Sequence, residues 1–506
     1  MVRPIAILLI VLVIIVAIGV PIALFVRQDD AAAAGEVVAD FDVDCYPEFD
    51  ADSFKADPSS CYSDNLDKAY RWYGPKTDYA LATGLKDTNV SEFTIPGCTP
   101  VMLYLFCRHG ARYPDLGDLE SMEVILNKFR NLTLDAHKKG KSHLCRKDIE
   151  ELQKWKFPYE FSEASQSMTQ GYLDLHMLAE RFQKMFPSLL PGTYSPSTYK
   201  FGVSNRDRTN QSLWAFAEIL FNSTEFEKIE YPRRDLKRVA FHKTCERLVW
   251  PNRSKPSREM FVEPEAFRKS PVAQRLVKNI KAKLGIEADL TYSEVRNVAI
   301  ECAVAYTAFR AAPWCAIFSK DDLLVTEYDD DIYDFHKDSY GRPLNPKMGC
   351  PVVNEITQLF SKAADVKKKN DVYKSVLYFA HSRDYKKLLG TFDLYRGDDP
   401  LTAAGYCSEN VRNRLWRDAI ISPYGANLAF ILFNCNGKHR VLALVNERPV
   451  QLPRCSYRRN DMLCDLDEFI AKYHFPNCDA KKICTPNAKN EQWPDSHWED
   501  AYTGAR

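Results

Sequence analysis

Residues 101–114 read VMLYLFCRHGARYP, an unbroken apolar run that ends in two arginines and a histidine. Such a run, introduced by the turn residues IPGC at 95–98, is typical of a strand that is buried on both faces. Arg108, His109 and Arg112 then lie where the strand ends. Because ligands of open α/β sheets bind beyond the carboxyl ends of the strands, this cluster predicts an anion-binding site there.

Two later segments repeat this format. YKFGVSN at 199–205 leads into the polar stretch that continues to Arg208, and SVLYFA at 375–380 is followed by His381. Between them, RDRTNQSLWAFAEILF at 206–221 places its apolar residues on one helical face. The three strand ends together carry arginines and histidines, which suit an anion with several oxygens.

The order of the predicted elements indicates the fold class. Strands near both ends, including a late hairpin around Asn436-Gly437, enclose charged stretches with helical spacing, so we expect an α/β core interrupted by helical insertions. The expected parts are a membrane segment at 1–27, a linker at 28–44, the main domain at 45–485 and a polar tail at 486–506. Within the main domain, the core covers about 45–115, 195–225 and 330–480, and the helical insertions cover about 116–194 and 226–329.

Composition excludes two classes of protein. Of 506 residues, 45% are apolar and 12% are aromatic, which is typical of a folded globular chain and not of a disordered one. Lys+Arg and Asp+Glu both number 68, so no overall field attracts nucleic acid or an acidic membrane surface. Any preference for anions is therefore local, and the strand-end cluster is its candidate.

The N-terminal segment carries no charge from Pro4 to Val26. At about 1.5 Å per residue, this stretch is long enough to cross a hydrocarbon core of about 30 Å. It predicts either a signal anchor with a cytosolic N-terminus or a signal peptide cleaved near Ala33. Both alternatives deliver residues 30–506 to the secretory pathway, as a single-pass membrane protein with its main domain in the lumen or outside the cell, or as a secreted protein.

Cysteine usage agrees with that destination. Fifteen cysteines are many for a cytosolic chain, and no CxxC or zinc-like spacing occurs, so we expect disulfides and neither a metal nor another cofactor. The count is odd, and Cys107, at the end of a buried strand, is the expected unpaired thiol. The sequence leaves the disulfide partners open, although three pairs are close: Cys45 and Cys61, Cys455 and Cys464, and Cys478 and Cys484. Glycosylation triplets occur at Asn89, Asn131, Asn210, Asn222 and Asn252.

The residue types at the strand ends indicate phosphate chemistry. Guanidinium groups bind phosphate oxygens in pairs and stay charged at any physiological pH. A neutral imidazole can attack phosphorus while arginines neutralise charge in the transition state. No GxxxxGK[ST] motif occurs, so no nucleotide is needed. Because a histidine at a strand end is more often a hydrogen-bonded core residue, the prediction depends on the longer R-H-G-x-R-x-P string.

The string RHGARYP at 108–114 resembles the signature of the histidine acid phosphatases, and its context GCTPVMLYLFCRHGARYPD resembles their multiple inositol polyphosphate phosphatase branch. Similar stretches are YGPKTDY at 73–79, DDPLTAAGY at 398–406, ISPYGANLAFILFNC at 421–435 and VLALVNERPVQLPRC at 441–455. The resemblance implies a mostly parallel sheet flanked by helices, with a helical insertion domain. It also implies removal of phosphate from inositol polyphosphates such as phytate through a phosphohistidine.

The resemblance assigns roles to single residues. His109 matches the nucleophile, and Arg108 and Arg112 match the phosphate-binding arginines that flank it. Arg208 matches the third arginine, because the R-x-x-x-S pattern of the family continues from it. His381 matches the second pocket histidine, which donates a hydrogen bond to the phosphate.

One family position differs in this chain. The branch continues its second histidine as His-Ala-Glu, and that glutamate protonates the leaving oxygen, whereas this chain reads His381-Ser382-Arg383-Asp384. Arginine cannot serve as the acid, because its pKa exceeds about 12. Asp384, one residue further on, is the predicted proton donor, and slow turnover is expected.

Two other functions stay open at this point. A chain that keeps the pocket but has lost the acid would be a phosphate-binding pseudophosphatase, and a less selective pocket would make a general acid phosphatase. The leading prediction is a phosphomonoesterase whose partner is a small phosphate ester, an inositol polyphosphate. It includes no nucleic-acid partner and a membrane contact only through the N-terminal segment.

Overall fold

The structure, a computed structural model, describes residues 43–50, 61–64, 72–230, 232, 234–249, 255–365, 372–458 and 461–485. The chain divides into two units, Met1–Asp40 and Phe41–Arg506, and all described residues belong to the second. The predicted membrane segment at 1–27, the tail at 486–506 and all but the last two residues of the linker at 28–44 lie outside the described residues. Within the described ranges, no helix is both long enough and apolar enough to cross a bilayer.

A seven-stranded mixed sheet organises this second unit, with the order β2-β3-β1-β4-β5-β6 and with β7 paired to β5. The strands are β1 (Cys98–Arg108), β2 (Tyr199–Val203), β3 (Ser375–Ala380), β4 (Asn427–Cys435), β5 (Lys438–Val445), β6 (Arg448–Val450) and β7 (Leu463–Asp465). β1 pairs in parallel with β3, and β3 pairs in parallel with β2. The pairings of β4 and β5 with their neighbours are all antiparallel.

The expectation of a mostly parallel sheet is therefore wrong, because antiparallel pairings outnumber parallel ones among the described strands. The cause is the hairpin that the sequence predicts at Asn436-Gly437. This two-residue turn joins β4 to β5 with φ angles of 52° and 89°, and such a turn forces the two strands to run antiparallel. β4 also lies antiparallel to β1, so the parallel pattern is confined to β1, β2 and β3.

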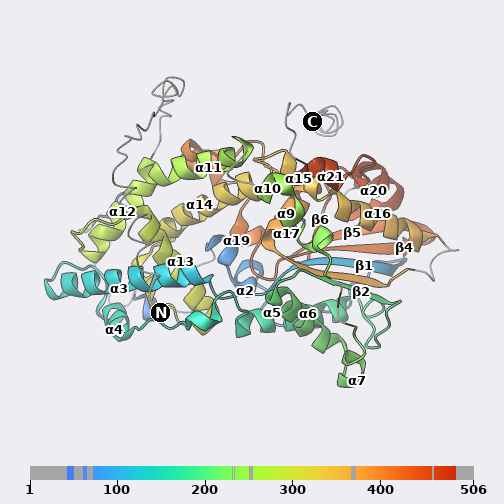
Figure 1. Cartoon of the computed structure of the whole chain (residues 1–506), viewed down its shortest axis with the longest axis horizontal. Coiled ribbons are helices and arrows are strands. Elements are labelled where there is room, and N and C mark those ends of the chain that lie inside the picture. The colour runs from blue at the N-terminus through green and yellow to red at the C-terminus, as the bar shows by residue number, and fades with distance from the viewer. Residues whose placement is uncertain are drawn as a thin grey trace, which may run out of the picture. The chain divides into compact units, whose positions relative to one another are not determined.

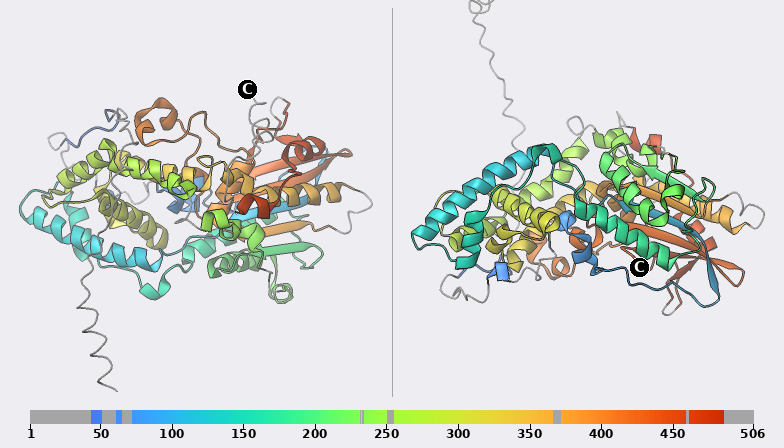
Figure 2. Two further views of the ribbon diagram at one scale, coloured as in Figure 1. Left: turned by 45° about the horizontal axis from the view of Figure 1, so that its top comes forward. Right: turned by 90° about the horizontal axis from the view of Figure 1, so that it is seen from below.

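The long helices fall into two groups, one packed on the sheet and one beside it (Figure 1). The sheet is covered by α5 (Thr169–Met185), α6 (Asp207–Leu220), α16 (Cys350–Ala364), α17 (Ser382–Thr391) and α20 (Leu466–Tyr473). Beside it lie α3 (Leu116–Lys138), α4 (Arg146–Lys154), α11 (Lys255–Lys269), α12 (Pro271–Leu284), α13 (Tyr292–Phe309) and α14 (Lys320–Asp338), a grouping that Figure 2 shows from two other sides. The short helices are α2 (Tyr79–Thr83), α7 (Ser223–Phe226), α8 (Leu236–Val239), α9 (Phe241–Thr244), α10 (Glu246–Val249), α15 (Leu344–Met348), α18 (Glu409–Arg412), α19 (Asp418–Ile421) and α21 (Ala480–Cys484).

Strand β1 lies inside the sheet, and its side chains alternate between two cores. Leu103 and Leu105 pack with residues of α5 and α6 on one face, whereas Tyr104 and Phe106 pack with residues of α16, α17 and α20 on the other. Figure 1 shows α5 and α6 below the sheet and α16 and α20 above it. An apolar run without polar alternation is what a strand covered on both faces requires, so this prediction is confirmed.

Disulfides join segments that are far apart in the sequence. Cys98–Cys435 links the first residue of β1 to the last residue of β4. Cys107 is the unpaired cysteine and is buried, as predicted. Of the three close pairs, only Cys455–Cys464 is bonded. The remaining disulfides are Cys45–Cys407, Cys61–Cys145, Cys245–Cys484, Cys302–Cys315 and Cys350–Cys478.

Candidate active site

The carboxyl ends of β1, β3 and β2 meet at one edge of the sheet, because these three strands are parallel neighbours. His109 follows β1, His381 follows β3 and Ser204 follows β2. The rings of His109 and His381 lie 5.6 Å apart, and Nε2 of His381 is 2.9 Å from the Ser204 hydroxyl oxygen. The strand ends that the sequence singles out therefore form one cluster.

His109 is held in the form that a nucleophile needs. Its Nδ1 lies 2.8 Å from the carbonyl oxygen of Gly110. Since a carbonyl only accepts, Nδ1 carries the proton and Nε2 keeps its lone pair. Burial, together with the positive charges of Arg208 and Arg108, lowers the pKa of His109 well below its usual value. The ring is therefore neutral and nucleophilic even in acidic solution.

Gly110 lets the chain pass directly against α5. A Cβ atom at Gly110 would lie 2.1 Å from the carbonyl oxygen of Gly171, and one at Gly171 would lie 2.2 Å from that of Ala111. Backbone atoms cannot move aside, so both positions require glycine. The Gly110 amide donates to Ser212 Oγ at 3.1 Å, and Ser212 donates to the Arg208 carbonyl oxygen at 2.7 Å. The serine of the R-x-x-x-S pattern thus ties α6 to the His109 loop.

Arg108 is buried and is held by neutral groups. Its Nη1 donates to the carbonyl oxygens of Pro75 and Ser422, both at 2.6 Å. Its guanidinium carbon lies 4.5 Å from the centre of the Tyr424 ring. Its Nε is buried without a hydrogen-bond partner among the described residues. Burial lowers the pKa of Arg108 to about 10, which leaves it charged at neutral pH, so the site contains a buried cation with an unused donor.

Arg208 and Arg112 add two more positive charges. Arg208 lies in the first turn of α6, and its Nε is likewise buried without a partner in the described part of the chain. Burial, followed by repulsion from Arg112, lowers the pKa of Arg208 to about 10. Arg112 is partly exposed, donates to the Tyr113 carbonyl oxygen at 2.8 Å and forms an ion pair with Asp115 at 3.1 Å. The three predicted phosphate-binding arginines are therefore close enough to repel one another.

His381 lies among positive charges at the start of α17. The pKa of His381 is lowered to about 2, mainly by burial and further by repulsion from Arg208, His242 and Lys243. Its ring is therefore neutral. When the Ser204 hydroxyl donates to Nε2, the ring carries its proton on Nδ1 and can donate to an anion. Both α17 and α6 begin at this edge of the sheet, so the positive ends of two helix dipoles add to the field.

Asp384 lies in the first turn of α17 and is fully buried. One carboxylate oxygen accepts from the His242 backbone amide at 3.0 Å, and the other lies 2.6 Å from His242 Nδ1. The His242 ring is 5.7 Å from the His381 ring. Both oxygens of the predicted proton donor are thus engaged by one histidine.

Arg383 stands where the resemblance expects a glutamate, and its side chain extends to Asp338 at the end of α14. Its Nε donates to an Asp338 carboxylate oxygen at 3.0 Å, and Lys387 binds the same carboxylate. Burial raises the pKa of Asp338, but Arg383 and Lys387 outweigh burial and hold that pKa far below the usual range. Asp338 is therefore ionised and cannot supply a proton.

His242 and Lys243 are site residues that the sequence patterns do not identify. They lie in α9, and His242 precedes its partner Asp384 by 142 residues. Burial and repulsion from Arg206 and Arg208 lower the pKa of Lys243, which places this lysine beside the same basic cluster. No motif or periodicity links α9 to α17, so only the three-dimensional contact of a histidine with a buried carboxylate reveals the pair.

One group with metal-like geometry lies in another part of the described chain. Cys61, Cys145 and Asp148 bring potential ligand atoms within 4.8 Å of one another. However, the two sulfurs form a disulfide, and the carboxylate accepts from the backbone amides of Tyr62 and Ser63. Metals bind thiolates, so this group is already used for structure.

The sequence containing these strand ends also matches a known family. Residues 102–446, more than half of the chain, match the sequence model of the histidine phosphatase superfamily (branch 2). The chain belongs to this family. The matched range includes every residue that the predictions place in the pocket of this histidine phosphatase: Arg108, His109, Arg112, Arg208, His381 and Asp384.

Curated relatives of this histidine phosphatase are similar over most of its length. Multiple inositol polyphosphate phosphatase 1 of Drosophila melanogaster is 25% identical over 429 residues, which cover 82% of this chain and 87% of the relative. The protein of the same name from Homo sapiens is 26% identical over 413 residues, which cover 75% of this chain and 82% of the relative.

Solved structures share the fold of this histidine phosphatase. The phytase from D. castellii matches with a TM-score of 0.64 at 17% identity, over 83% of this chain and 89% of that one. The multiple inositol polyphosphate phosphatase of Bifidobacterium longum, in complex with inositol hexasulfate, matches with a TM-score of 0.59 at 12% identity, over 81% and 98%. The likeness establishes an α/β fold with a mixed sheet flanked by helices.

Proposed function

We propose that this histidine phosphatase is a phosphomonoesterase that removes phosphate from inositol polyphosphates through a phosphohistidine. The observation that carries the proposal is the charge of the pocket around His109. Arg108 and Arg208 have buried Nε groups without partners among the described residues, and burial lowers the pKa of both side chains. Buried cations with unused donors are costly unless an anion completes them. A phosphate dianion supplies the charge and the acceptors together.

His109 is the proposed nucleophile. Its Nε2 attacks phosphorus and the bond to the leaving oxygen breaks, while the three pocket arginines hold the other oxygens of the transferred group. His381 donates a hydrogen bond to the same group. Water then attacks the phosphohistidine, releases phosphate and restores His109. Asp384 is the carboxyl to which the sequence assigns protonation of the leaving group.

The relatives and a surplus of basic residues favour inositol polyphosphates as the substrate class. Two relatives carry the name multiple inositol polyphosphate phosphatase. Arg206 and Lys243 add positive charge around His381 and Arg208 beyond the arginines that serve one phosphate. A substrate with several phosphates can bind such charges, whereas a simple aryl phosphate has nothing to place there.

The disulfides support a secretory location for this enzyme. Seven disulfides need an oxidising compartment to form and persist. Asn89, Asn131 and Asn222 are exposed, whereas Asn210 is buried in α6, so glycans are expected at the first three and not at Asn210. Asn252 lies outside the described residues. The N-terminal segment at 1–27, as an anchor or a cleaved signal, remains part of this proposal.

Phosphate release from inositol hexakisphosphate by the full chain, purified from a secretory expression host, tests the proposed function. Acid-labile phosphate should be trapped on the wild-type protein during turnover and should be missing from His109→Ala. Release of one phosphate per chain without turnover would indicate a pseudophosphatase instead. Equal rates on inositol hexakisphosphate and simple aryl phosphates would indicate a general acid phosphatase.

A further inference from the structure

His242 and Asp384 form a buried pair next to the pocket that the nucleophilic step does not use. Asp384 Oδ2 lies 2.6 Å from His242 Nδ1, and Asp384 Oδ1 accepts from the His242 backbone amide at 3.0 Å. We propose that His242 is the proton donor to the leaving oxygen and that Asp384 positions it. This inference rests on the proposed phosphatase function. An imidazole would thus replace the carboxyl that the sequence predicts for this role.

The carboxylate determines which ring nitrogen of His242 is available. A carboxylate beside Nδ1 keeps a proton there, so any second proton is carried by Nε2. Nε2 makes no hydrogen bond with the described residues, and the side chain retains 7% of its surface exposed. A carboxylate on one nitrogen and a reacting atom at the other is also how histidine is oriented in acyl-transfer enzymes.

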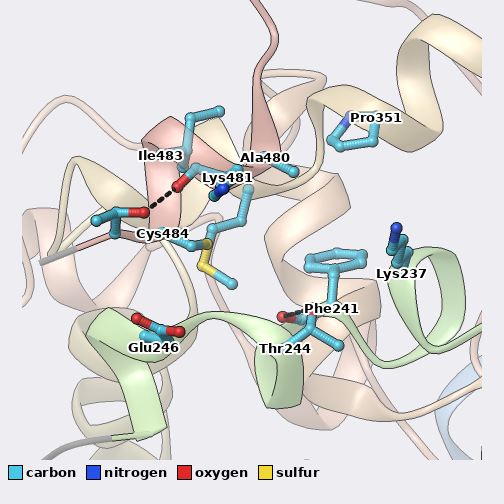
Figure 3. A pocket seen from close by; sticks show the side chains of 11 residues that line it. Lys237, Phe241, Thr244, Glu246, Pro351, Ala480, Lys481, Ile483 and Cys484 are labelled. Carbon is cyan, nitrogen blue, oxygen red and sulfur yellow. Dashed lines mark hydrogen bonds between the residues drawn. The ribbon is translucent and has the colours of Figure 1, made fainter.

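Two further contacts fix the segment that carries His242. Cys245, directly after α9, forms a disulfide with Cys484 of α21. Phe241 and Thr244 line a cavity of about 330 Å³ between α9 and α21, and Figure 3 shows their side chains at its wall. Because Phe241 is buried in the hydrophobic core and Cys245 is held by the disulfide, the position of His242 beside Asp384 is determined by several independent contacts.

The His381 ring connects His242 to the nucleophile, since it lies 5.6 Å from the His109 ring and 5.7 Å from the His242 ring. In-line displacement places the nucleophile and the leaving oxygen on opposite sides of phosphorus, so the attacking nitrogen and the proton donor must be about 7 Å apart. His109 and His242 both lie next to His381, and at these distances the two rings can stand on opposite sides of a phosphoryl group. A donor in direct contact with His109 could not.

Asp384 is poorly placed to donate the proton itself. The residue is fully buried, and His242 engages both of its oxygens. Arg383, its neighbour in α17, is bound to Asp338 and holds its own protons too strongly to release one. The His242 side chain keeps 7% of its surface exposed and the Asp384 side chain none, so a substrate oxygen can reach the imidazole more easily than the carboxyl.

The proposed reaction balances over two steps. In the first, His109 Nε2 bonds to phosphorus, the bond to the leaving oxygen breaks, and this oxygen takes the Nε2 proton of cationic His242. In the second, water attacks the phosphohistidine, the electrons of the N–P bond return to His109, and neutral His242 takes a proton from the water. The products are the inositol hydroxyl and inorganic phosphate, and His242 ends protonated, as it began.

His242→Gln tests the proposal through the leaving group. An inositol alkoxide needs a proton as it departs, whereas a nitrophenolate does not. Phosphorylation of the enzyme, followed by rapid quenching, should slow by about 10²- to 10⁴-fold with inositol hexakisphosphate and by less than about tenfold with p-nitrophenyl phosphate. The affinity for inositol hexasulfate should change little, because the phosphate-binding arginines are intact.

Two controls accompany this variant. Asp384→Asn should also slow phosphorylation by inositol hexakisphosphate more than by p-nitrophenyl phosphate, but by a smaller factor than His242→Gln. The double variant should be no slower than His242→Gln alone, because the effects of residues that act as a unit are not additive. His439→Gln should leave both rates unchanged. His439 pairs with Asn434 of β4, which pairs with Thr99 at the opposite end of β1 from His109.

Equal losses on the two substrates, or no loss on either, would overturn the proposal, because donation to the leaving oxygen must discriminate between them. A larger loss for Asp384→Asn than for His242→Gln would assign donation to the carboxyl. If thermal unfolding shows that His242→Gln does not fold, the rates of Asp384→Asn on the two substrates are compared instead. Equal losses on both, or no loss on either, would again overturn the proposal. Failure of the proposed function is a distinct result, since the wild-type protein would then either turn over neither substrate or hydrolyse both at equal rates.

Discussion

The pocket has two sides that hold their positive charges differently. On the His109 side, formed by Arg108 and His109, the polar partners are backbone carbonyl oxygens. On the His242 side, formed by His242 and Arg383, the partners are buried carboxylates. Both sides border the same strand ends, so the contrast is one of chemistry and not of location.

The difference shows how one site serves two purposes. Carbonyl dipoles orient a guanidinium without cancelling its charge, so the His109 side keeps its full attraction for a phosphate dianion. Carboxylates neutralise their partners and fix their orientation, so the His242 side adds little net charge but holds a proton-carrying ring in place. The attraction for phosphate and the handling of protons are therefore separated in space.

Loss of the nucleophile should give the largest effect on the His109 side. His109→Ala removes the nitrogen that bonds to phosphorus, so kcat should fall by about 10⁶-fold, the scale of losing a catalytic nucleophile. Calorimetric titration should still show binding of inositol hexasulfate, because the arginines remain. A variant with wild-type turnover would show that the bond to phosphorus forms elsewhere.

The two arginines of the pocket with buried Nε atoms come next. Arg108→Ala and Arg208→Ala each remove one donor, and kcat/KM for inositol hexakisphosphate should fall by about 10²- to 10³-fold in each case. Arg440→Ala is the matched control, because its ion pairs with Asp461 and Asp465 involve β5 and lie outside the pocket. If all three variants lost activity equally, the effect would reflect overall charge and not the loss of donors in the pocket.

On the His242 side, the ion pairs predict an effect on stability. Arg383→Glu places a second carboxylate against buried Asp338, so the free energy of unfolding should fall by about 3 kcal/mol, the scale of breaking a buried ion pair. From the sequence alone, we would expect this substitution to raise activity on phytate, because it restores the glutamate that donates the proton in the family. Arg383→Gln, which adds no charge, should lose less in urea unfolding. Unchanged stability in both variants would show that Lys387 alone satisfies Asp338.

The smallest effect, taken per pH unit, concerns the pH dependence of stability. The pKa of His381 is about 2 in the folded chain, against about 6.5 when unfolded, so between these values the unfolded chain binds one more proton. Stability from this residue is fully present above the unfolded value and falls by about 1.4 kcal/mol per pH unit below it. His381→Asn should remove that part of the slope, as urea unfolding at several pH values would show. An unchanged slope would mean that the folded pocket already binds the proton.

The two sides also differ in how far sequence reasoning predicts them. The His109 side depends on one continuous stretch, in which an apolar run, a strand end and the motif follow one another, and β1 ends at Arg108 as expected. The hairpin at Asn436-Gly437 and the helix at 207–220 are equally local, and both are confirmed. Each of these features is determined by neighbouring residues through side-chain periodicity or turn geometry.

Features that depend on distant contacts were not predictable in this way. The contact of His242 with Asp384 requires α9 to pack against α17, and neither segment carries a local mark of the other. The antiparallel pairing of β4 with β1 depends on tertiary packing in the same manner. Cys45, close to Cys61 in sequence, bonds to Cys407 instead, because spatial proximity determines disulfide partners.

The place of β1 between β3 and β4 has a consequence for synthesis in the cell. Cys98, at the start of β1, bonds to Cys435, which is 337 residues later. A ribosome that adds about 5–20 residues per second needs on the order of half a minute to translate that interval. Until β3 and then β4 are made, the nascent strand lacks its neighbours, and its apolar surface makes the chain prone to aggregation. Prematurely terminated chains would therefore contain the complete RHGARYP motif and yet be without activity.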